Sequence, residues 1–427
     1  MELLQTITPW IGLALCAMAV LQLALWSSQS LSLISQNKKQ FELSLELLKK
    51  QIQASNPPQK TRTQPSDQGQ GRWSGYRPFR VAKLVKETDT CTSVYLVPED
   101  GKAIAAFHPG QHLTVKFQIP GETKPVIRCY SLSDEPSKSY YRISVKALPS
   151  PNDKPDLTPG RASSFINQQL VENTRIEAKA PSGHFVLDEA TETPIILLAG
   201  GIGVTPMVSM VNHLVHQQSS RRIVMFYGAS NTADHPFKAH FSKLAAEHDN
   251  FDVVYCYSQP TDQEIVGRDF HVDGFVSLDV LKKVLPSNQF QFYMCGPPKF
   301  MNSLYQGLLD WGTPESNIFF EAFGPASIGK VKNKTTAEIR AETEAVIKFA
   351  KSEVDAKWNS NSDSILELAE ENEVTIQSGC RAGNCGTCAT QILSGQVTYP
   401  DHDQVDCEPG QCLACIAKPK GNVELDA

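Results

Sequence analysis

Cysteine placement constrains this chain more than any other feature of its sequence. The chain has eleven cysteines, and six of them lie between residue 380 and residue 415. These six are Cys380, Cys385, Cys388, Cys407, Cys412 and Cys415. A secreted protein held by disulfides is usually small and carries its cysteines along its whole length. Clustering at one end therefore predicts a metal site in a reducing compartment.

The spacing within the cluster indicates which metal group it holds. Cys380, Cys385 and Cys388 follow the C-x4-C-x2-C spacing of plant-type 2Fe–2S sites, which need one further cysteine. The segment that ends in Cys415 resembles the apolar strand carrying the last ligand in ferredoxins, so the resemblance implies Cys415 as the fourth ligand. The rivals for that place are Cys407 and Cys412. A structural zinc site is the alternative for the whole cluster.

Length and charge set broader limits. A chain of 427 residues is long enough for two or three globular units. Its 41% hydrophobic and 20% charged residues are ordinary for globular protein. The net charge of −6 argues against a nucleic-acid partner, which calls for a basic face.

The N-terminal end has the pattern of a membrane anchor. No charged residue occurs between Glu2 and Lys38, and the segment 7–26 is predominantly apolar. As a helix it would reach about 30 Å, the thickness of a bilayer core. The lysines follow the apolar stretch, so the positive-inside rule predicts a single-pass protein of the inner membrane whose soluble domains face the cytoplasm. An uncleaved apolar tail or a buried core helix is the alternative.

Two further segments follow the anchor. Residues 31–52 place apolar side chains at alternating steps of three and four, a pattern typical of either a homodimeric coiled coil or an amphipathic helix on a membrane surface. Residues 54–75 are rich in Gln, Pro, Ser and Gly, which predicts a flexible tether.

From Tyr76 onward, short apolar runs alternate with turns. The runs are Phe79–Val85, Ser93–Val97, His112–Ile119 and Tyr141–Val145. Strands of this length and spacing predict an antiparallel β-barrel.

Two motifs in this region resemble the flavin site of the ferredoxin–NADP reductase superfamily. The first is Arg128-Cys-Tyr130-Ser131. The resemblance implies that Arg128 binds phosphate, that Tyr130 stacks on the flavin, and that the Ser131 hydroxyl reaches flavin N5. The second is a phosphate-binding turn that opens a helix, and its residues are Gly160, Ser163 and Ser164. The family uses FAD or FMN, and FAD is favoured here.

An α/β nucleotide domain is predicted next. An apolar strand, residues 194–199, leads into a glycine-rich turn and a helix, Met207–His216. Such a turn lets the backbone approach a pyrophosphate, and the helix start stabilises its charge. The turn residues expected to bind it are Gly200, Gly201, Gly203, Thr205 and Pro206. Further strands, Ile223–Tyr227 and Phe251–Tyr257, alternate with helical segments, as in an open sheet.

Two more strands carry candidate catalytic residues. The strand Phe290–Met294 ends in Cys295 and Gly296, which resemble the superfamily motif beside the nicotinamide ring. The last strand, Ile318–Phe323, resembles the one that brings an acid and an aromatic ring to the flavin, which implies roles for Glu321 and Phe323. The stretch after the second strand, residues 228–234, has no Lys or Arg for a 2′-phosphate, and this favours NADH over NADPH.

The order of these units predicts the organisation. The boundaries expected are a transmembrane anchor (1–30), an amphipathic helix and linker (31–75), a flavin barrel (76–188), an NAD(P) domain (189–326), a linker (327–342) and an α+β ferredoxin domain (343–427). This order resembles oxygenase reductases and the NADH reductase of the hybrid-cluster protein.

The resemblance implies an electron-transfer enzyme. Electrons would pass from NAD(P)H through flavin and the 2Fe–2S cluster to a partner protein such as an oxygenase, hydroxylase, desaturase or hybrid-cluster protein. The anchor suggests that this acceptor is membrane-bound. The alternatives are a flavin-dependent reductase of quinones or ferric complexes, with the cluster as an internal relay, and a non-enzymatic zinc or interaction protein.

Overall fold

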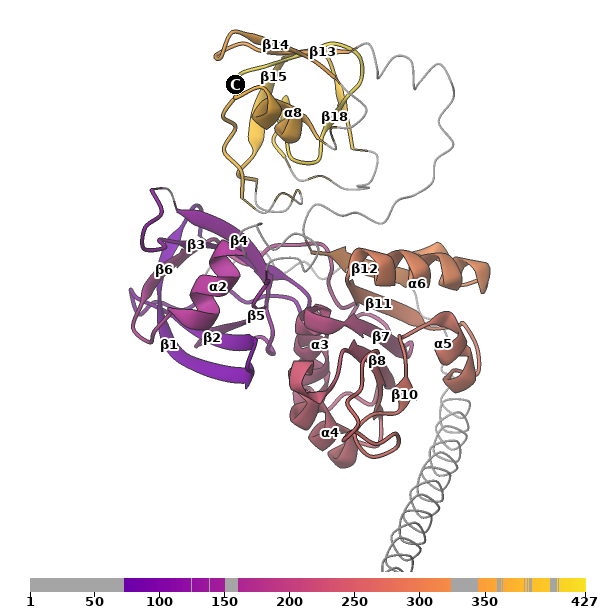
Figure 1. Cartoon of the computed structure of the whole chain (residues 1–427). Helices are drawn as coiled ribbons and strands as arrows, with labels where there is room; N and C mark the ends of the chain where they lie inside the picture. The colour runs from indigo at the N-terminus through magenta and orange to yellow at the C-terminus, as the bar shows by residue number, and fades with distance from the viewer. Residues whose placement is uncertain are drawn as a thin grey trace, which may run out of the picture.

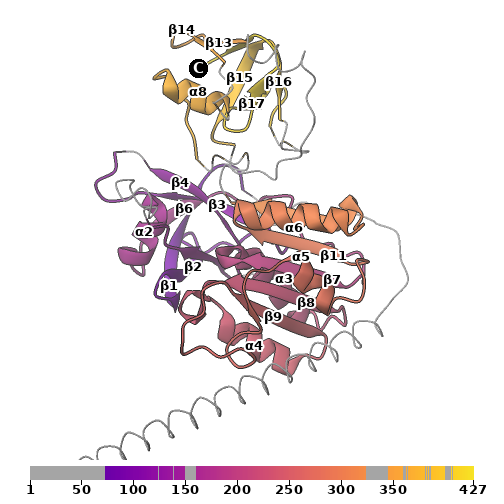
Figure 2. The ribbon, with the colours of Figure 1, turned by 45° about the vertical axis from the view of Figure 1, so that its right-hand side comes forward.

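The computed structural model describes residues 73–427, apart from positions 124, 138, 150–159, 324–344, 359–361, 363, 380, 382, 384–385, 400–404 and 406. Three units follow one another along the chain: an antiparallel sheet, a parallel sheet with helices, and a small mixed sheet (Figure 1). The first two units lie against each other, and the C-terminal unit lies on the side where strand β4 (Val126–Ser131) is found (Figures 1 and 2).

The first unit is a six-stranded antiparallel sheet. Its other strands are β1 (Arg77–Thr88), β2 (Cys91–Pro98), β3 (His112–Phe117), β5 (Tyr141–Lys146) and β6 (Arg175–Ala178), in the order β4-β3-β6-β1-β2-β5. Alternating residues of these strands, such as Phe79, Val81 and Leu113, form the core together with helix α2 (Arg161–Gln168).

The predicted closed barrel is wrong. The terminal strands of the described sheet, β4 and β5, share no strand ladder, and one isolated bridge, Leu132 to Ile143, joins the segments beside them. The sheet curls without closing because β4 ends at Ser131 and the chain then turns toward the second unit. One consequence is that β4 stays an edge strand, and its outer side can receive a ligand.

The second unit is a parallel α/β sheet. Its strands are β7 (Ile195–Gly200), β8 (Ile223–Ala229), β9 (Phe251–Tyr257), β10 (Val272–Asp273), β11 (Gln291–Gly296) and β12 (Ile318–Ala322), in the order β10-β9-β8-β7-β11-β12. Its helices are α3 (Val204–His216), α4 (Lys238–Glu247), α5 (Leu278–Val284) and α6 (Pro298–Asp310), and its 3-10 turns are Gly201–Gly203, Thr232–Asp234 and Glu315–Asn317. Two apolar clusters bury the two faces of this sheet. Strand order reverses between β7 and β11, where ligands of such sheets bind beyond the carboxyl ends.

The third unit is a small α+β fold. Five strands form one sheet in the order β14-β13-β19-β15-β17. These are β13 (Val346–Phe349), β14 (Val354–Lys357), β15 (Ala389–Ser394), β17 (Gln411–Leu413) and β19 (Val423–Leu425); β16 (Val397–Thr398) pairs with β18 (Lys418–Pro419). Helix α8 (Ile365–Glu371) is capped by Ser364, whose hydroxyl accepts from the Glu367 amide. The helix buries Ile365 and Leu368 against the sheet.

The predicted membrane location needs correction. Across the part of the chain that the structure describes, no helix has both the length and the apolar character needed to cross a bilayer. The segment 7–26, on which the prediction of an anchor was based, lies outside the described residues, as do residues 31–52 of the predicted homodimer contact. The single-pass inner-membrane location is therefore withdrawn.

Candidate functional site

Edge strand β4 carries the three residues of the first predicted flavin motif. Arg128 and Tyr130 are half-buried, whereas Ser131 at the end of the strand is buried. The Arg128 guanidinium donates from Nη1 to the carbonyls of Ile127 (2.7 Å) and Gly379 (3.3 Å). Among the ion pairs between described residues, Arg128 takes part in none, so its charge has no carboxylate partner there. A guanidinium held by carbonyls alone fits a site for phosphate oxygens.

Ser131 meets residues of the second unit. Its hydroxyl donates to Glu321 Oε2 at 3.2 Å, although the two residues are 190 positions apart in the chain. Glu321 lies beside Cys295 in the register of β12 and β11. Burial, and next the Glu321 charge, raises the pKa of the Cys295 thiol well above its usual value, so this cysteine stays a neutral thiol. The structure thus brings together three of the four predicted catalytic residues.

The fourth, Phe323, follows the end of β12 and is 40% exposed. A histidine that the sequence did not indicate takes part instead: His112 Nδ1 lies 3.6 Å from Glu321 Oε1, and the side chain is 3% exposed. His112 is paired with Ser131 in the β3–β4 register. The sequence could have indicated a role for His112 only if strands β3 and β4 had been aligned, because that alignment places His112 opposite Ser131.

The second predicted flavin motif forms a tight turn at the start of α2. The Ser163 hydroxyl donates to the Gly160 carbonyl (3.0 Å) and accepts from the Leu148 amide (3.2 Å). A Cβ on Gly160 would lie 2.6 Å from Ser163 Oγ, which is too close. The Ser164 amide donates to the Gly160 carbonyl, and the Gly160 amide donates to the Leu148 carbonyl. The amides of the first helical turn, between these two, lack helical acceptors as at any helix start. The turn fits a phosphate-binding role at a helix start.

The glycine-rich turn lies at the reversal point of the parallel sheet. Gly200 ends β7, and Gly203 precedes helix α3. A Cβ on Gly203 would collide with the carbonyl oxygen of Cys295 and would lie 2.8 Å from the amide nitrogen of Gly296. The two backbones therefore touch, and Thr205 closes the turn by donating to the Ile202 carbonyl at 3.1 Å. Such close backbone packing at a helix start fits a bound dinucleotide.

In the third unit, two of the predicted cluster ligands come together. The sulfur atoms of Cys388 and Cys415 are 3.1 Å apart, both residues are buried, and neither is in a disulfide. Cys380 and Cys385 lie outside the described residues. Among the described residues no group of three or more potential ligands forms a metal site. Two adjacent sulfurs of the right chemistry fit half of a four-thiolate site.

The rival fourth ligands, Cys412 and Cys407, make other contacts. Cys412 lies on β17 opposite Thr390, and burial raises the pKa of its thiol to about 12. Cys407 donates to the Gln411 carbonyl at 3.5 Å. The sulfur of Cys388 contacts that of Cys415 at 3.1 Å. This geometry favours Cys415.

A pH-dependent contact joins the first two units. Glu189, on the segment between them, lies 3.8 Å from His108 Nδ1 and 3.1 Å from His213 Nε2. The contacts with His108 and His213 lower the pKa of the Glu189 carboxyl from 4.5 to about 2. A lowered carboxyl pKa stabilises the fold above pH 4.5, and this contribution is lost as the pH falls toward 2.

Glu189→Gln should therefore destabilise the protein at pH 6, by less than about 1 kcal/mol because the pair is partly exposed. The difference in urea midpoint between variant and wild type should shrink between pH 4.5 and pH 2. Thr191→Ser, on the same segment, is the control and should show no such trend, because it changes no charge and keeps the hydroxyl that contacts Thr193. A Glu189→Gln difference that grows on acidification would contradict the assignment.

Comparisons with known proteins agree with the three units. Residues 82–187 match the model of the oxidoreductase FAD-binding domain, residues 197–306 match the oxidoreductase NAD-binding domain, and residues 347–420 match the 2Fe-2S iron-sulfur cluster binding domain. A flavohemoprotein of Bacillus cereus is 40% identical over 258 residues, which are 60% of this chain and 63% of the relative. The chain thus spans less than two thirds of the length of such curated relatives.

Two solved structures are similar as well. The FAD/NAD-binding domain of nitric oxide dioxygenase from Vibrio cholerae superposes with a TM-score of 0.52 at 30% identity, over 58% of this chain and 99% of that one. Phthalate dioxygenase reductase superposes with a TM-score of 0.50 at 26% identity. That protein is described as a modular structure for electron transfer from pyridine nucleotides to [2Fe-2S]. The match covers 83% of this chain and 98% of that one, and so extends over all three units.

Proposed function

Because this chain belongs to the ferredoxin–NADP reductase superfamily, as a flavin reductase with a C-terminal 2Fe–2S ferredoxin domain, we propose that it passes electrons from NADH to a partner oxygenase. It is an NAD(P)H-dependent flavin and iron–sulfur oxidoreductase, and its cofactors are FAD and a 2Fe–2S cluster. Membership of this family sets aside the alternative of a non-enzymatic zinc protein. The identity of the acceptor rests on the likeness to phthalate dioxygenase reductase.

One observation carries the proposal: strand β4 contacts both other units. From its end, Ser131 reaches Glu321 of the nucleotide domain at 3.2 Å. From its middle, Arg128 reaches the carbonyl of Gly379, next to the first predicted cluster ligand, at 3.3 Å. A cofactor bound along β4 would thus lie between the nicotinamide crevice and the cluster loop, and this supports a path from donor to cluster through the flavin.

The residues of the flavin site would divide the work of binding. Arg128 and the turn at Gly160 and Ser163 would hold the phosphates, and Tyr130 would stack on the ring system. When bound, FAD takes up the electron pair of a hydride and releases the electrons one at a time to an iron–sulfur cluster. Ser131 would hold a proton at its hydroxyl and share it with the Glu321 carboxylate, because the two are already hydrogen-bonded.

The remaining residues would bind the donor and the cluster. Gly200, Gly201 and Gly203 with the start of α3 would take the pyrophosphate of the nucleotide, beside Thr205, Pro206 and Gly296. Cys295, a buried neutral thiol, would line the nicotinamide position. The cluster would be held by Cys380, Cys385, Cys388 and Cys415.

The charge near the ribose position supports NADH as the donor. After β8, the Thr232 amide donates to the Glu264 carboxylate at 2.6 Å, and that carboxylate also accepts from the Thr261 amide at 2.7 Å. Asp234 is paired with Lys146 of the flavin domain at 2.6 Å. Lys146 neutralises Asp234, and Lys238 donates to Thr232 Oγ1 at 3.3 Å, so Glu264 is the carboxylate that favours a ribose hydroxyl over a 2′-phosphate here.

Anaerobic titration of the full chain with NADH tests the proposal. We expect the flavin and 2Fe–2S absorption bands to bleach together, and an electron paramagnetic resonance signal of a reduced cluster to appear. NADPH should also bleach these bands, but the dissociation constant for NADPH should be at least about tenfold higher than that for NADH, which is the cost of one unfavourable charge contact. A chain that binds FAD and iron but keeps both bands after NADH is added would overturn the proposed function.

A further inference from the structure

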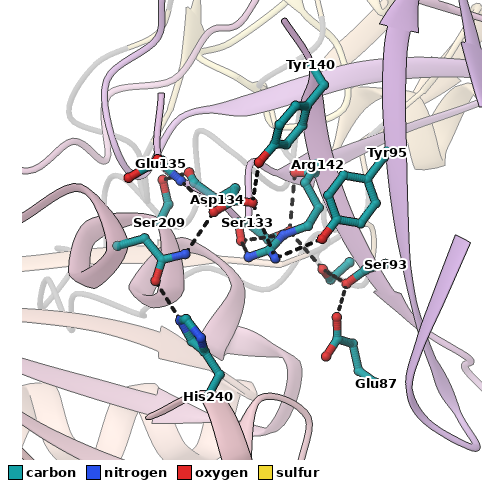
Figure 3. Close-up of polar contacts among 12 residues, drawn as sticks. Glu87, Ser93, Tyr95, Ser133, Asp134, Glu135, Tyr140, Arg142, Ser209 and His240 are labelled. Atoms are coloured by element: carbon teal, nitrogen blue, oxygen red, sulfur yellow. Dashed lines mark hydrogen bonds and ion pairs between the residues drawn. The ribbon is translucent and has the colours of Figure 1, made fainter. Parts of the chain in front are cut away.

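A continuous polar network crosses the interface between the flavin and nucleotide domains (Figure 3). It is centred on Asp134, three residues after Ser131 in the chain. We infer that the contact between Asp134 and Asn212 is a positioning device, which sets the nicotinamide crevice against the flavin strand and so controls the rate of hydride transfer. This inference rests on the proposed function.

On the flavin-domain side, Asp134 is fixed by its own domain. Its carboxylate accepts from Tyr140 Oη at 3.0 Å and is paired with Arg142 Nη1 at 3.3 Å. The side chains of Asp134 and Arg142 are 13% and 10% exposed. Arg142 also donates from Nε to the Ser133 carbonyl at 2.9 Å. The carboxylate is therefore held in one orientation by an ion pair largely withdrawn from water.

Tyr140 acts only as a donor to this carboxylate. Burial, and next the Asp134 charge, raises the pKa of Tyr140 to about 12. The hydroxyl thus keeps its proton through the physiological range. In Figure 3 Tyr140 and Arg142 both point at Asp134, from the flavin-domain side.

Across the interface, helix α3 makes two contacts with the same residue. Asn212 Nδ2 donates to Asp134 Oδ1 at 2.8 Å, and the Ser209 hydroxyl donates to the Asp134 carbonyl at 2.7 Å. His240 of α4 then contacts Asn212 Oδ1 from its Nε2 at 2.7 Å. Since an amide oxygen accepts, His240 must donate there, and the amide of Asn212 is held with its nitrogen toward Asp134.

His240 supports this orientation as a neutral ring. Burial, and next the charge of Arg142, lowers the pKa of His240. The network therefore contains the ion pair of Asp134 with Arg142. Its hydrogen bonds all run the same way: His240 donates to Asn212, and Asn212 donates to Asp134. If one donor in this chain were replaced by an acceptor, two acceptors would face each other without a hydrogen between them. The contact is therefore sensitive to single substitutions.

The contact between Asp134 and Asn212 lies close in the chain to both the flavin strand and the glycine-rich turn. Asp134 lies three residues from Ser131, and Asn212 lies seven residues after Thr205 on the rigid helix α3, which begins at the glycine-rich turn. At 1.5 Å per residue, Thr205 and Asn212 are separated by roughly 10 Å of helix. Because α3 is rigid, a displacement of Asn212 would displace the glycine-rich turn by nearly the same distance. Misplacement of reacting groups by about 1 Å can slow a reaction by about 100-fold.

The test uses a reciprocal exchange in the FAD- and cluster-loaded full chain. Asn212→Asp places a carboxylate against Asp134, and we expect it to slow flavin reduction by NADH by between about 10-fold and 100-fold. The dissociation constant for NADH should change by less than about threefold, because the turn that binds the pyrophosphate is intact. Adding Asp134→Asn restores an amide-to-carboxylate pair and should recover part of the lost rate. Asn212→Ala, which removes the donor without repulsion, serves if Asn212→Asp does not fold.

The control and a second measurement separate positioning from general damage. Asp310→Asn removes an exposed carboxylate on α6 and should leave the reduction rate unchanged. Spin labels on unnatural amino acids at the exposed positions Ala82 and Lys283 report the distance between the two domains. Pulsed electron resonance should show a broader or shifted distance distribution for Asn212→Asp but not for Asp310→Asn.

Three results would overturn the inference: a reduction rate within about twofold of wild type in folded Asn212→Asp or Asn212→Ala, a double variant no faster than the single one, or an unchanged distance distribution. Failure of the wild type to accept electrons from NADH would instead contradict the proposed function. In that case the distance distributions still decide whether Asp134 and Asn212 position the domains.

Discussion

Cys415→Ser is expected to remove the 2Fe–2S cluster and, with it, electron transfer through the cluster to protein acceptors. The sulfur of Cys415 lies 3.1 Å from that of Cys388, so the variant loses a ligand from the half of the site that the structure describes. Cytochrome c reduction should fall by at least about 100-fold, the upper end of what even outer-shell substitutions cost metal sites. Ferricyanide reduction, which can draw on the flavin directly, should persist.

Iron content, the electron resonance signal and the two reductase activities measure this result. Cys412→Ser is the matched control, because Cys412 is equally buried but lies on β17 opposite Thr390. It should keep iron and cytochrome c reduction. The reverse outcome, with iron lost in Cys412→Ser and retained in Cys415→Ser, would move the fourth ligand to Cys412. Full cytochrome c reduction by a cluster-free Cys415→Ser protein would favour the alternative of a flavin-dependent reductase.

Gly203→Ala should be among the most damaging single substitutions in the nucleotide domain. The added methyl group would collide with the carbonyl oxygen of Cys295, a backbone atom in the central strand β11. Overpacking of this kind costs about 1–3 kcal/mol, and we expect the upper end because neither backbone can rotate away. The KM for NADH should rise at the same time, since the shift opens the crevice between β7 and β11.

Calorimetry and steady-state kinetics check this prediction. Gly307→Ala, on helix α6, is the control: the new Cβ would lie 3.2 Å from the Cβ of Leu278, a side chain that can adjust. Alanine also favours the helix by up to about 1 kcal/mol. A Gly203→Ala protein with unchanged unfolding temperature and KM would show that the backbones at this point are not in forced contact.

Much of the fold could be predicted because its signals are local. The apolar run before Gly200 and the run Phe251–Tyr257 became strands β7 and β9, and the helix predicted from Met207 was found to begin at Val204. Buried parallel strands are continuous in sequence, so their pattern is visible without knowledge of neighbours. Strands β6 and β10 were not predicted, because each has at most four residues and no clear alternation.

The errors and omissions concern relations between distant segments. Closure of the first sheet depends on whether β4 and β5 pair, and no periodicity within either strand reports that. Asp134, Asn212 and His112 are ordinary polar residues in sequence, and they acquire partners only when two domains or two strands meet. The prediction of a membrane anchor rests on an apolar, charge-free stretch followed by lysines, which lies outside the described residues, and the described residues give it no support.

The hydrogen bond from Ser131 to Glu321 has a consequence for biosynthesis. A ribosome completes the flavin domain long before it adds the carboxylate, because the partners are 190 positions apart. At about 5–20 residues per second, that interval lasts roughly 10–40 seconds. A nascent chain paused within it would carry a finished flavin fold whose serine still faces water. The hydrogen-bond partner of Ser131 therefore arrives only with the final strand of the nucleotide domain, β12.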